Sequence, residues 1–216
     1  MLKEIEIKDY PVILVSDSHT NLSNLRKLKE LYPNNLLISL GDFTFLFAKE
    51  GEPYNNLSIQ YFIDNKIPAL RGNHEDFLIA SEENNNIIKG NVGGKTNDFN
   101  LSKEYLDYLK SLPIGFKLIL PNGRYYLLYH NKPNSLWCFP TKKPNFKEFL
   151  QTYPVDINCL GVVKGHEHIN YVVDFKENSC KLIVLGQLCN SDHHNKNNSG
   201  GNYGIITESG FEFKKL

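Results

Sequence analysis

The feature that most constrains the fold is an alternation of short apolar runs with segments of helical periodicity. The runs at Pro11–Ser16 and Leu36–Leu40 are almost wholly apolar, which is typical of strands buried on both faces. Between them, Asn21–Leu31 carries leucines three residues apart and begins with a residue suited to cap a helix. Such an alternation of strands and helices predicts an α/β sheet in the first half of the chain.

The rest of the chain extends this pattern and then changes it. A further strand is predicted at Ile67–Leu70, and helices at Leu57–Asn65, Asp76–Glu83 and Leu101–Leu112. Seven later segments predict strands: Phe116–Leu120, Tyr125–Tyr129, Cys159–Val163, Tyr171–Phe175, Lys181–Leu185, Tyr203–Thr207 and Phe211–Lys215. One more helix is predicted at Asn145–Gln151, and loops at Glu82–Asn100 and Ser191–Asn202. We expect a mixed α/β (α+β) fold with two packed sheets and outer helices, in one domain of residues 1–216.

Composition excludes several classes of function. The 216 residues include 24 Lys and Arg against 24 Asp and Glu, so the formal net charge is zero. This balance argues against broad binding to nucleic acid or to an anionic membrane. The chain has no apolar run long enough to span a bilayer and no N-terminal apolar signal, so we expect a cytoplasmic location. The four cysteines are too widely spaced for a zinc ribbon or a redox pair, and buried free thiols are expected.

Five of the expected strands are followed directly by residues that can bind a metal ion. These residues are Asp17 and His19, Asp42, Asn73 and His74, His130, and His166 and His168. Ligands of open α/β sheets collect beyond the carboxyl ends of strands, so residues far apart in the chain can converge there. A single Asp or His after a strand is more often a turn or capping residue. The conjunction at five strand ends is what predicts a metal site.

The residue types suit a pair of divalent cations. Asp17 and His19 stand two residues apart and can face one point from a loop, and His166 and His168 repeat this spacing. A carboxylate beside an imidazole suits ions such as Mn, Fe, Zn or Co. Asp42 stands alone after a glycine, where it is a natural bridge between two ions. Two ions about 3.5–4 Å apart form the clamp used for in-line displacement at phosphorus.

This series of motifs resembles the calcineurin-like metallophosphoesterase superfamily over essentially the whole chain. The motifs are Asp17-Ser18-His19, Gly41-Asp42, Gly72-Asn73-His74-Glu75, His130 and Gly165-His166-Glu167-His168. The resemblance implies a four-layer αββα sandwich, in which helices flank two mixed sheets and a dinuclear metal site lies at the sheet edges. It also implies two bound divalent ions, which we expect to be Mn in preference to Fe, Zn, Ni or Co.

The resemblance further implies a role for each motif residue. One ion would be held by Asp17, His19, Asp42 and His168, and the other by Asp42, Asn73, His130 and His166. A metal-bound hydroxide would attack phosphorus in line, without a phosphoenzyme. Asn73 would help the ions to stabilise charge on the phosphate oxygens, and His74 would assist the leaving group as an acid or an electrostatic stabiliser.

One departure from the family pattern bears on the substrate. The chain looks most like the small phage and bacterial serine/threonine-type phosphatases, which continue the second motif as Gly-Asp-x-x-Asp-Arg-Gly. Here that segment runs Gly41-Asp42-Phe43-Thr44-Phe45-Leu46, and the Asp-Arg pair is missing. The paired histidines of the last motif match the smaller bacterial phosphodiesterase-like branch. We therefore expect a small phosphomonoester or phosphodiester as substrate, with neither a membrane nor a nucleic acid as partner.

Several alternatives remain open from the sequence. The chain could be a protein phosphatase of the small phage and bacterial kind, a catalytically idle binding scaffold, or a nuclease-like member. Arg71 could touch phosphate or form a structural ion pair. Four aromatic residues could line an apolar wall or belong to the core: Phe43, Phe45, Phe47 and Trp137. The run Asp192-His193-His194 is interpreted as a solvated turn.

Overall fold

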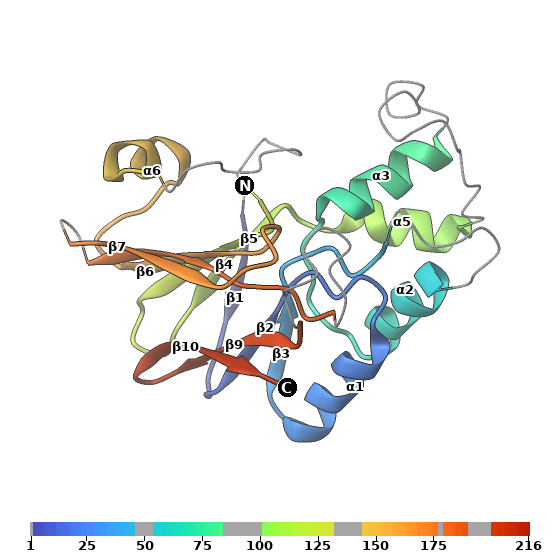
Figure 1. The fold of residues 1–216 in the computed structure, drawn as a ribbon, viewed down its shortest axis with the longest axis horizontal. Helices are drawn as coiled ribbons and strands as arrows, with labels where there is room; N and C mark the ends of the chain where they lie inside the picture. The colour runs from blue at the N-terminus through green and yellow to red at the C-terminus, as the bar shows by residue number, and fades with distance from the viewer. Residues whose placement is uncertain (1, 46–53, 84–100, 132–143, 177–178, 190–199) are drawn as a thin grey trace.

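The computed structural model describes residues 2–45, 54–83, 101–131, 144–176, 179–189 and 200–216. Within these ranges the chain forms two mixed β-sheets with helices outside them (Figure 1). The six-stranded sheet, in spatial order, comprises β1 (Lys3–Glu6), β4 (Gly115–Ile119), β5 (Tyr125–Tyr129), β6 (Cys159–Lys164), β8 (Cys180–Val184) and β7 (Tyr171–Phe175). The four-stranded sheet comprises β10 (Gly210–Lys215), β9 (Asn202–Thr207), β2 (Val12–Val15) and β3 (Leu36–Ser39). The helices are α1 (Leu22–Leu31), α2 (Tyr54–Asp64), α3 (Asn73–Glu82), α5 (Lys103–Ser111) and α6 (Phe146–Thr152).

Three apolar clusters hold the layers together. Alternate residues of a strand face opposite sides of its sheet, so each sheet contributes to two clusters. Leu14 of β2 and Val163 of β6 belong to the cluster between the sheets. Ile13, on the opposite face of β2, packs with side chains of α1, α2, α3 and α5. Leu127 of β5 shares the third cluster with Phe149 of α6, so the predicted four-layer arrangement is confirmed.

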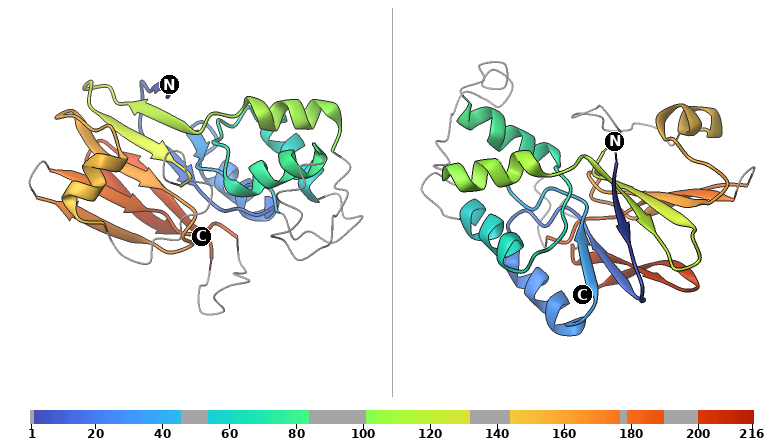
Figure 2. Two further views of the ribbon diagram at one scale, coloured as in Figure 1. Left: turned by 90° about the horizontal axis from the view of Figure 1, so that it is seen from above. Right: turned by 180° about the vertical axis from the view of Figure 1, so that it is seen from behind.

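The helices divide unequally between the two outer faces. In both views of Figure 2, α1, α2, α3 and α5 gather on one side of the sheets, away from α6. No helix in the described ranges has both the length and the apolar character needed to cross a membrane. The cysteines at positions 159, 180 and 189 are buried and free, as their spacing predicts.

Several elements differ from the sequence-based expectations, and α2, for example, begins at Tyr54 and not at Leu57. The edge strand β1 was not expected, because its residues Lys-Glu-Ile-Glu are largely exposed and form no apolar run. The strand predicted at Ile67–Leu70 is reduced to a single bridge between Ser39 and Ala69 at the edge of β3. Helix α3 begins at Asn73 and not at Asp76, because the backbone N–H of Gly72 donates to the Glu75 carboxylate and caps the first turn.

The topology brings four strand ends to one place. Strands β2 and β3 are parallel neighbours in one sheet, and β5 and β6 are parallel neighbours in the other. A hydrogen bond from the Gly165 amide to the His130 carbonyl (3.2 Å) ties together the segments that follow β5 and β6. The amide of His166 donates to Asp17 Oδ2 at 2.9 Å and so links the two sheets. The residues that follow these strands therefore share one edge of the molecule.

Candidate metal centre

The structure brings together the seven residues that the sequence predicts as metal ligands. Each follows a strand or begins a helix at the common edge: Asp17 and His19 after β2, Asp42 after β3, Asn73 at the start of α3, His130 after β5, and His166 and His168 after β6. Five of them have left-handed backbone with φ between +42° and +72°: Asp17, His19, Asp42, His166 and His168. Side-chain-bearing residues adopt this conformation at a cost, and such strain gathers at functional sites.

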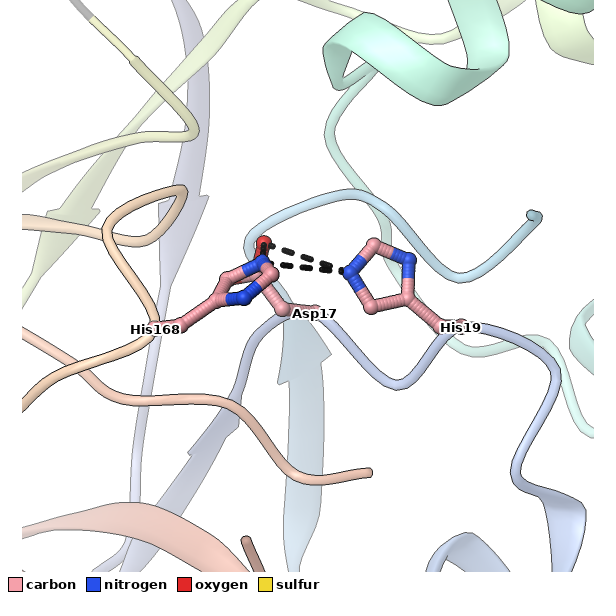
Figure 3. A group of neighbouring side chains, drawn as sticks. All are labelled: Asp17, His19 and His168. Atoms are coloured by element: carbon pink, nitrogen blue, oxygen red, sulfur yellow. Dashed lines mark hydrogen bonds and ion pairs between the residues drawn. The ribbon is translucent and has the colours of Figure 1, made fainter. Parts of the chain in front are cut away.

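One group consists of Asp17, His19 and His168 (Figure 3). The Nε2 atoms of the two histidines lie 3.2 Å apart. Asp17 Oδ1 lies 3.3 Å from His168 Nε2 and 3.9 Å from His19 Nε2. Three ligand atoms from two loops, far apart in the sequence, therefore converge on one point.

A second group consists of Asp42, His130 and His166, and all three residues are buried. His130 Nε2 lies 3.1 Å from Asp42 Oδ2. Asn73 Oδ1 lies 2.9 Å from His130 Nε2 and 2.8 Å from His166 Nδ1, so the amide oxygen joins this group. Asp42 also forms a ligand group with His19 and His74, which places its carboxylate between the two clusters.

Backbone carbonyls orient two of the imidazole rings. His130 Nδ1 lies 3.0 Å from the Leu40 carbonyl oxygen, and His19 Nδ1 lies 3.3 Å from that of Thr44. A ring whose Nδ1–H donates to a carbonyl leaves Nε2 as the free lone pair. In both histidines Nε2 is also the atom that faces a carboxylate of the cluster. The fold therefore directs Nε2 of both rings toward the carboxylates, which is the orientation that ligation through Nε2 requires.

The two oxygens of the Asp17 carboxylate have different partners. Its Oδ2 atom accepts hydrogen bonds from Ser16 Oγ at 2.5 Å and from the His166 amide at 2.9 Å. Its Oδ1 atom is buried and faces the Nε2 atoms of His168 and His19. Burial opposes ionisation, but His168, with smaller contributions from other histidines, holds the pKa of Asp17 well below its ordinary value. The carboxylate is therefore ionised and directed into the cluster.

Asp42 is arranged in the same way. Its Oδ1 atom accepts a hydrogen bond from the His74 amide at 2.9 Å, and its Oδ2 atom faces His130. Burial would raise the pKa of Asp42, but His130 and then His74 bring it below its ordinary value. Burial would lower the pKa of His130, whereas the Asp42 charge raises it to about 9. For His166, burial followed by repulsion from His130 lowers the pKa to about 4.

These donors fit divalent cations. Two buried carboxylates, an amide oxygen and imidazole nitrogens are the mixed oxygen and nitrogen set that suits Mn, Fe, Zn or Co. Buried carboxylates need a compensating positive charge, and the Oδ1 atom of Asp17 lies among the candidate ligand atoms of its group. The nitrogens of His19 and His168 converge beside it, as ligands of a shared ion do.

His74 lies beside the cluster in an aromatic environment. Its Nε2 atom is 3.9 Å from Asp42 Oδ2, and its ring centroid is 4.7 Å from that of His19. The Phe45 ring stacks on His74 at 5.5 Å with an interplanar angle of 11°, and it also contacts His19 at 5.3 Å. Burial lowers the pKa of His74 to about 3 against the opposing attraction of Asp42, so the imidazole is neutral at pH 7.

The aromatic residues that could form an apolar wall or belong to the core do not share one environment. Phe45 reaches the site, and the Asn55 side chain bonds both its amide, at 2.7 Å, and its carbonyl, at 3.0 Å. Phe43 instead lies in the core and stacks on Phe62 at 4.2 Å, which excludes it from a wall. The other members, Phe47 and Trp137, lie outside the described residues, as does the run Asp192-His193-His194. Arg71 forms an ion pair with Asp76 at 2.9 Å, which matches the structural interpretation of this arginine.

Glu75 was not singled out by the sequence analysis beyond its place in a motif. Its Oε2 atom accepts hydrogen bonds from the amides of Asp42 (2.9 Å) and Gly72 (2.8 Å). Its Oε1 atom accepts bonds from the Thr44 amide (2.9 Å) and hydroxyl (2.8 Å). Burial, followed by repulsion from Asp42, raises the pKa of this carboxyl. The sequence does contain a signal for this role, because a Glu three residues after the residue that precedes a helix is a capping pattern.

Two mixed sheets that carry a cluster of Asp, His and Asn side chains at their strand ends define the metallophosphoesterase class of fold. A family model described as calcineurin-like phosphoesterase matches residues 10–186. The chain therefore belongs to the calcineurin-like phosphoesterase family, which confirms the resemblance seen in its motifs.

Solved structures share this fold at low sequence identity. A metallophosphoesterase from Sphaerobacter thermophilus is 18% identical with a TM-score of 0.64, over 96% of this chain and 88% of that one. An archaeal phosphodiesterase is 16% identical with a TM-score of 0.52, over 96% and 100%. A protein serine/threonine phosphatase from Saccharomyces cerevisiae is 13% identical with a TM-score of 0.51, over 100% and 84%. Among curated proteins, none matches the chain significantly.

Proposed function

We propose that this protein hydrolyses a small phosphomonoester or phosphodiester with the help of two divalent cations. The observation that carries the proposal is the convergence of two ligand groups with the buried Asp42 carboxylate between them. Membership of the calcineurin-like phosphoesterase family supports the same class of reaction.

The proposed ligand sets follow the two groups. One cation is held by Asp17, His19, Asp42 and His168, and the other by Asp42, Asn73, His130 and His166. When bound, the cations supply positive charge for the phosphate oxygens and activate water. The mixed carboxylate, amide and imidazole donors suit Mn²⁺, which we propose as the preferred ion.

His74 is proposed to act on the leaving group. Its imidazole is neutral, because burial lowers its pKa to about 3, so it carries one N–H and no net charge. From its position beside Asp42 and His19 it can donate a hydrogen bond to the leaving oxygen of the ester and so stabilise the negative charge that develops there. The backbone bond from the His74 amide to Asp42 Oδ1 fixes the start of the helix that carries this ring.

The surroundings of His74 support a small ester over a phosphoprotein. Protein phosphatases of the resembling branch place an Asp-Arg pair in the segment where this chain has Phe45 and Leu46. Phe45 stacks on His74 and offers an apolar surface to whatever lies beside it. Arg71, the arginine nearest in sequence to the motif of His74, is engaged with Asp76. These groups favour an uncharged or aromatic leaving group over an extended phosphopeptide.

The test is a substrate panel measured with added Mn²⁺. It compares an aryl phosphate, a bis-aryl phosphate, a cyclic nucleotide, a dinucleoside polyphosphate and a phosphopeptide, for the wild type and for His74→Asn. We expect turnover of a small ester, with most of it lost in His74→Asn while the Mn²⁺ content of the variant is unchanged. Preference for the phosphopeptide would instead indicate a protein phosphatase. Tight Mn²⁺ binding without turnover of any ester would indicate a binding scaffold.

A further inference from the structure

A buried ion pair lies within the segment that carries two of the candidate ligands. Lys164 is the last residue of β6, and its side chain is only 2% exposed. Its Nζ atom lies 2.5 Å from Oε1 of Glu167, whose side chain is 9% exposed. The second carboxylate oxygen of Glu167 accepts a hydrogen bond from the Tyr171 hydroxyl at 2.7 Å. Glu167 stands between His166 and His168, so both of its chain neighbours belong to the candidate centre.

The lysine end of this pair is anchored in the middle of a sheet. Strand β6 lies between β5 and β8, and Lys164 is in register with Tyr129 on one side and Val184 on the other. The Lys164 carbonyl also accepts a hydrogen bond from the Leu185 amide at 2.7 Å. A residue bonded on both sides in this way has little freedom. The backbone of Lys164 is therefore fixed, and its ammonium group can hold Glu167 in one position.

The segment held by Glu167 has an irregular backbone. His166 has φ of +72° and His168 has φ of +59°, both in the left-handed region. Within this turn the Glu167 amide bonds the Gly165 carbonyl at 3.0 Å. Two left-handed residues on either side of one glutamate need support from outside the turn. The Glu167 side chain supplies it through Lys164 and Tyr171.

A buried ion pair is poor evidence for a stabilising role. Lysine is almost never fully buried unless it is paired, and the loss of hydration often cancels the attraction between the charges. Replacement of such a pair by apolar or neutral residues of similar size is often neutral or even stabilising. A better-attested use of buried charges is to select one local conformation among several. Here the conformation at stake is that of the two histidines.

We propose that Lys164 and Glu167 form a positioning pair that directs His166 and His168 toward two separate cation positions. This inference rests on the proposed function, because it assigns cations to both ligand groups. His166 lies with Asp42 and His130, whereas His168 lies with Asp17 and His19. One ion pair thus controls a ligand in each group. Its removal should weaken both positions together, unlike the loss of either histidine alone.

The experiment measures Mn²⁺ binding to metal-free protein by isothermal titration calorimetry, with bound Mn²⁺ counted by elemental analysis. The variant is Lys164→Met combined with Glu167→Gln, which keeps the net charge and leaves no unpaired buried ion. A matched control is Lys181→Met, since Lys181 lies on the adjacent strand β8 in an exposed pair with Asp174. We expect the double variant to bind Mn²⁺ about 10–100-fold more weakly at both positions, as is typical when groups behind metal ligands are lost. The melting temperature of the metal-free variant should stay within a few degrees of the wild type.

Three outcomes separate this inference from the proposed function. Wild-type affinity at both positions in the double variant would overturn the positioning role, while the wild type still binds Mn²⁺ and hydrolyses esters. Weakening at only one position would also overturn it. If the wild type binds no Mn²⁺, the proposed function itself fails. The single variant Lys164→Arg keeps the ion pair and should retain more Mn²⁺ affinity than the double variant; equal loss in both variants would show that side-chain volume, and not the pair, sets the affinity.

Discussion

Gly165→Ala should weaken cation binding, because the added methyl group would displace the Ser16 hydroxyl that donates to Asp17 and would crowd the Asp17 carboxylate. A Cβ atom at Gly165 would collide with Ser16 Oγ and would stand 2.9 Å from Asp17 Oδ2. Gly72 plays the same part for the other carboxylate, since a Cβ atom there would collide with Asp42 Oδ1. Each candidate bridging or terminal carboxylate is thus approached by a residue without a side chain.

The size of the effect follows from these distances. Ordinary contacts of a Cβ atom begin at 3.4 Å, so the Asp17 oxygen at 2.9 Å must move by the difference, 0.5 Å. Metal–ligand distances tolerate only about 0.2 Å, so this shift is enough to disrupt ligation. We expect Mn²⁺ affinity to fall by about 10–100-fold. Overpacking should also destabilise the fold by about 1–3 kcal/mol, which lowers Tm by roughly 2–12 °C for a chain of this size.

The assay pairs calorimetric Mn²⁺ titration with thermal unfolding of the metal-free protein. Gly123→Ala is the matched control, because Gly123 has φ of +78° and a Cβ atom there would meet no atom of the described residues within 4 Å. That substitution costs backbone strain but moves no carboxylate, so it should lower Tm slightly and leave Mn²⁺ affinity unchanged. The reasoning is refuted if Gly165→Ala binds Mn²⁺ as tightly as the wild type, or if Gly123→Ala loses affinity to the same extent.

Three further predictions concern the supports of the site. Glu75→Gln replaces one acceptor oxygen by an NH₂ group, which cannot accept the hydrogen bonds that this oxygen receives. The free energy of unfolding, measured by urea titration, should fall by about 2–5 kcal/mol. An unchanged midpoint and slope of the titration would contradict this. Asn55→Ala removes both hydrogen bonds that hold the Phe45 backbone, and should reduce ester turnover several-fold without changing bound Mn²⁺, a result that equal turnover would disprove. Removal of bound metal with EDTA should lower Tm, and Mn²⁺ at 100 times its Kd should then raise the free energy of unfolding by about 2.7 kcal/mol. The measurements are made in Mg-free buffer, and a sample with chelator alone shows whether the shift is specific to Mn²⁺.

The convergence of the candidate ligands was largely predictable, because these residues lie in short motifs at strand ends. Asp17 and Asp42 follow apolar runs that are easily recognised as buried strands, and parallel neighbours place such ends together. The same logic fails for β1, whose charged residues carry no strand pattern, and it could not find Lys164. A lysine at the end of an apolar run is normally solvated, and only the tertiary structure shows that Glu167 folds back to pair with it.

Helix α3 shows why the boundaries of functional segments are harder to predict than their presence. The sequence pattern predicts a loop at Asn73 and His74, after a strand, because neither residue is a strong helix former. The helix nevertheless includes them, since Glu75 caps its first turn through Gly72 and at the same time binds the Asp42 segment. The Glu75 carboxylate therefore caps the helix and also accepts the hydrogen bond from the Asp42 amide. Its pairing partner lies 33 residues away, beyond the reach of local propensity.

The neutral composition is compatible with phosphate binding because the relevant charge is local. Two divalent cations would bring four positive charges, from which the carboxylates of Asp17 and Asp42 subtract two, so the cluster would carry 4 − 2 = +2 with neutral histidines. Without cations, the two ionised carboxylates outnumber the protonated His130, so the site would not attract anions. Attraction of phosphate therefore depends on the cations and not on an excess of arginine or lysine. A chain of zero net charge can discriminate in this way between a small phosphate ester, which fits one concentrated positive site, and a polyanion, which needs an extended one.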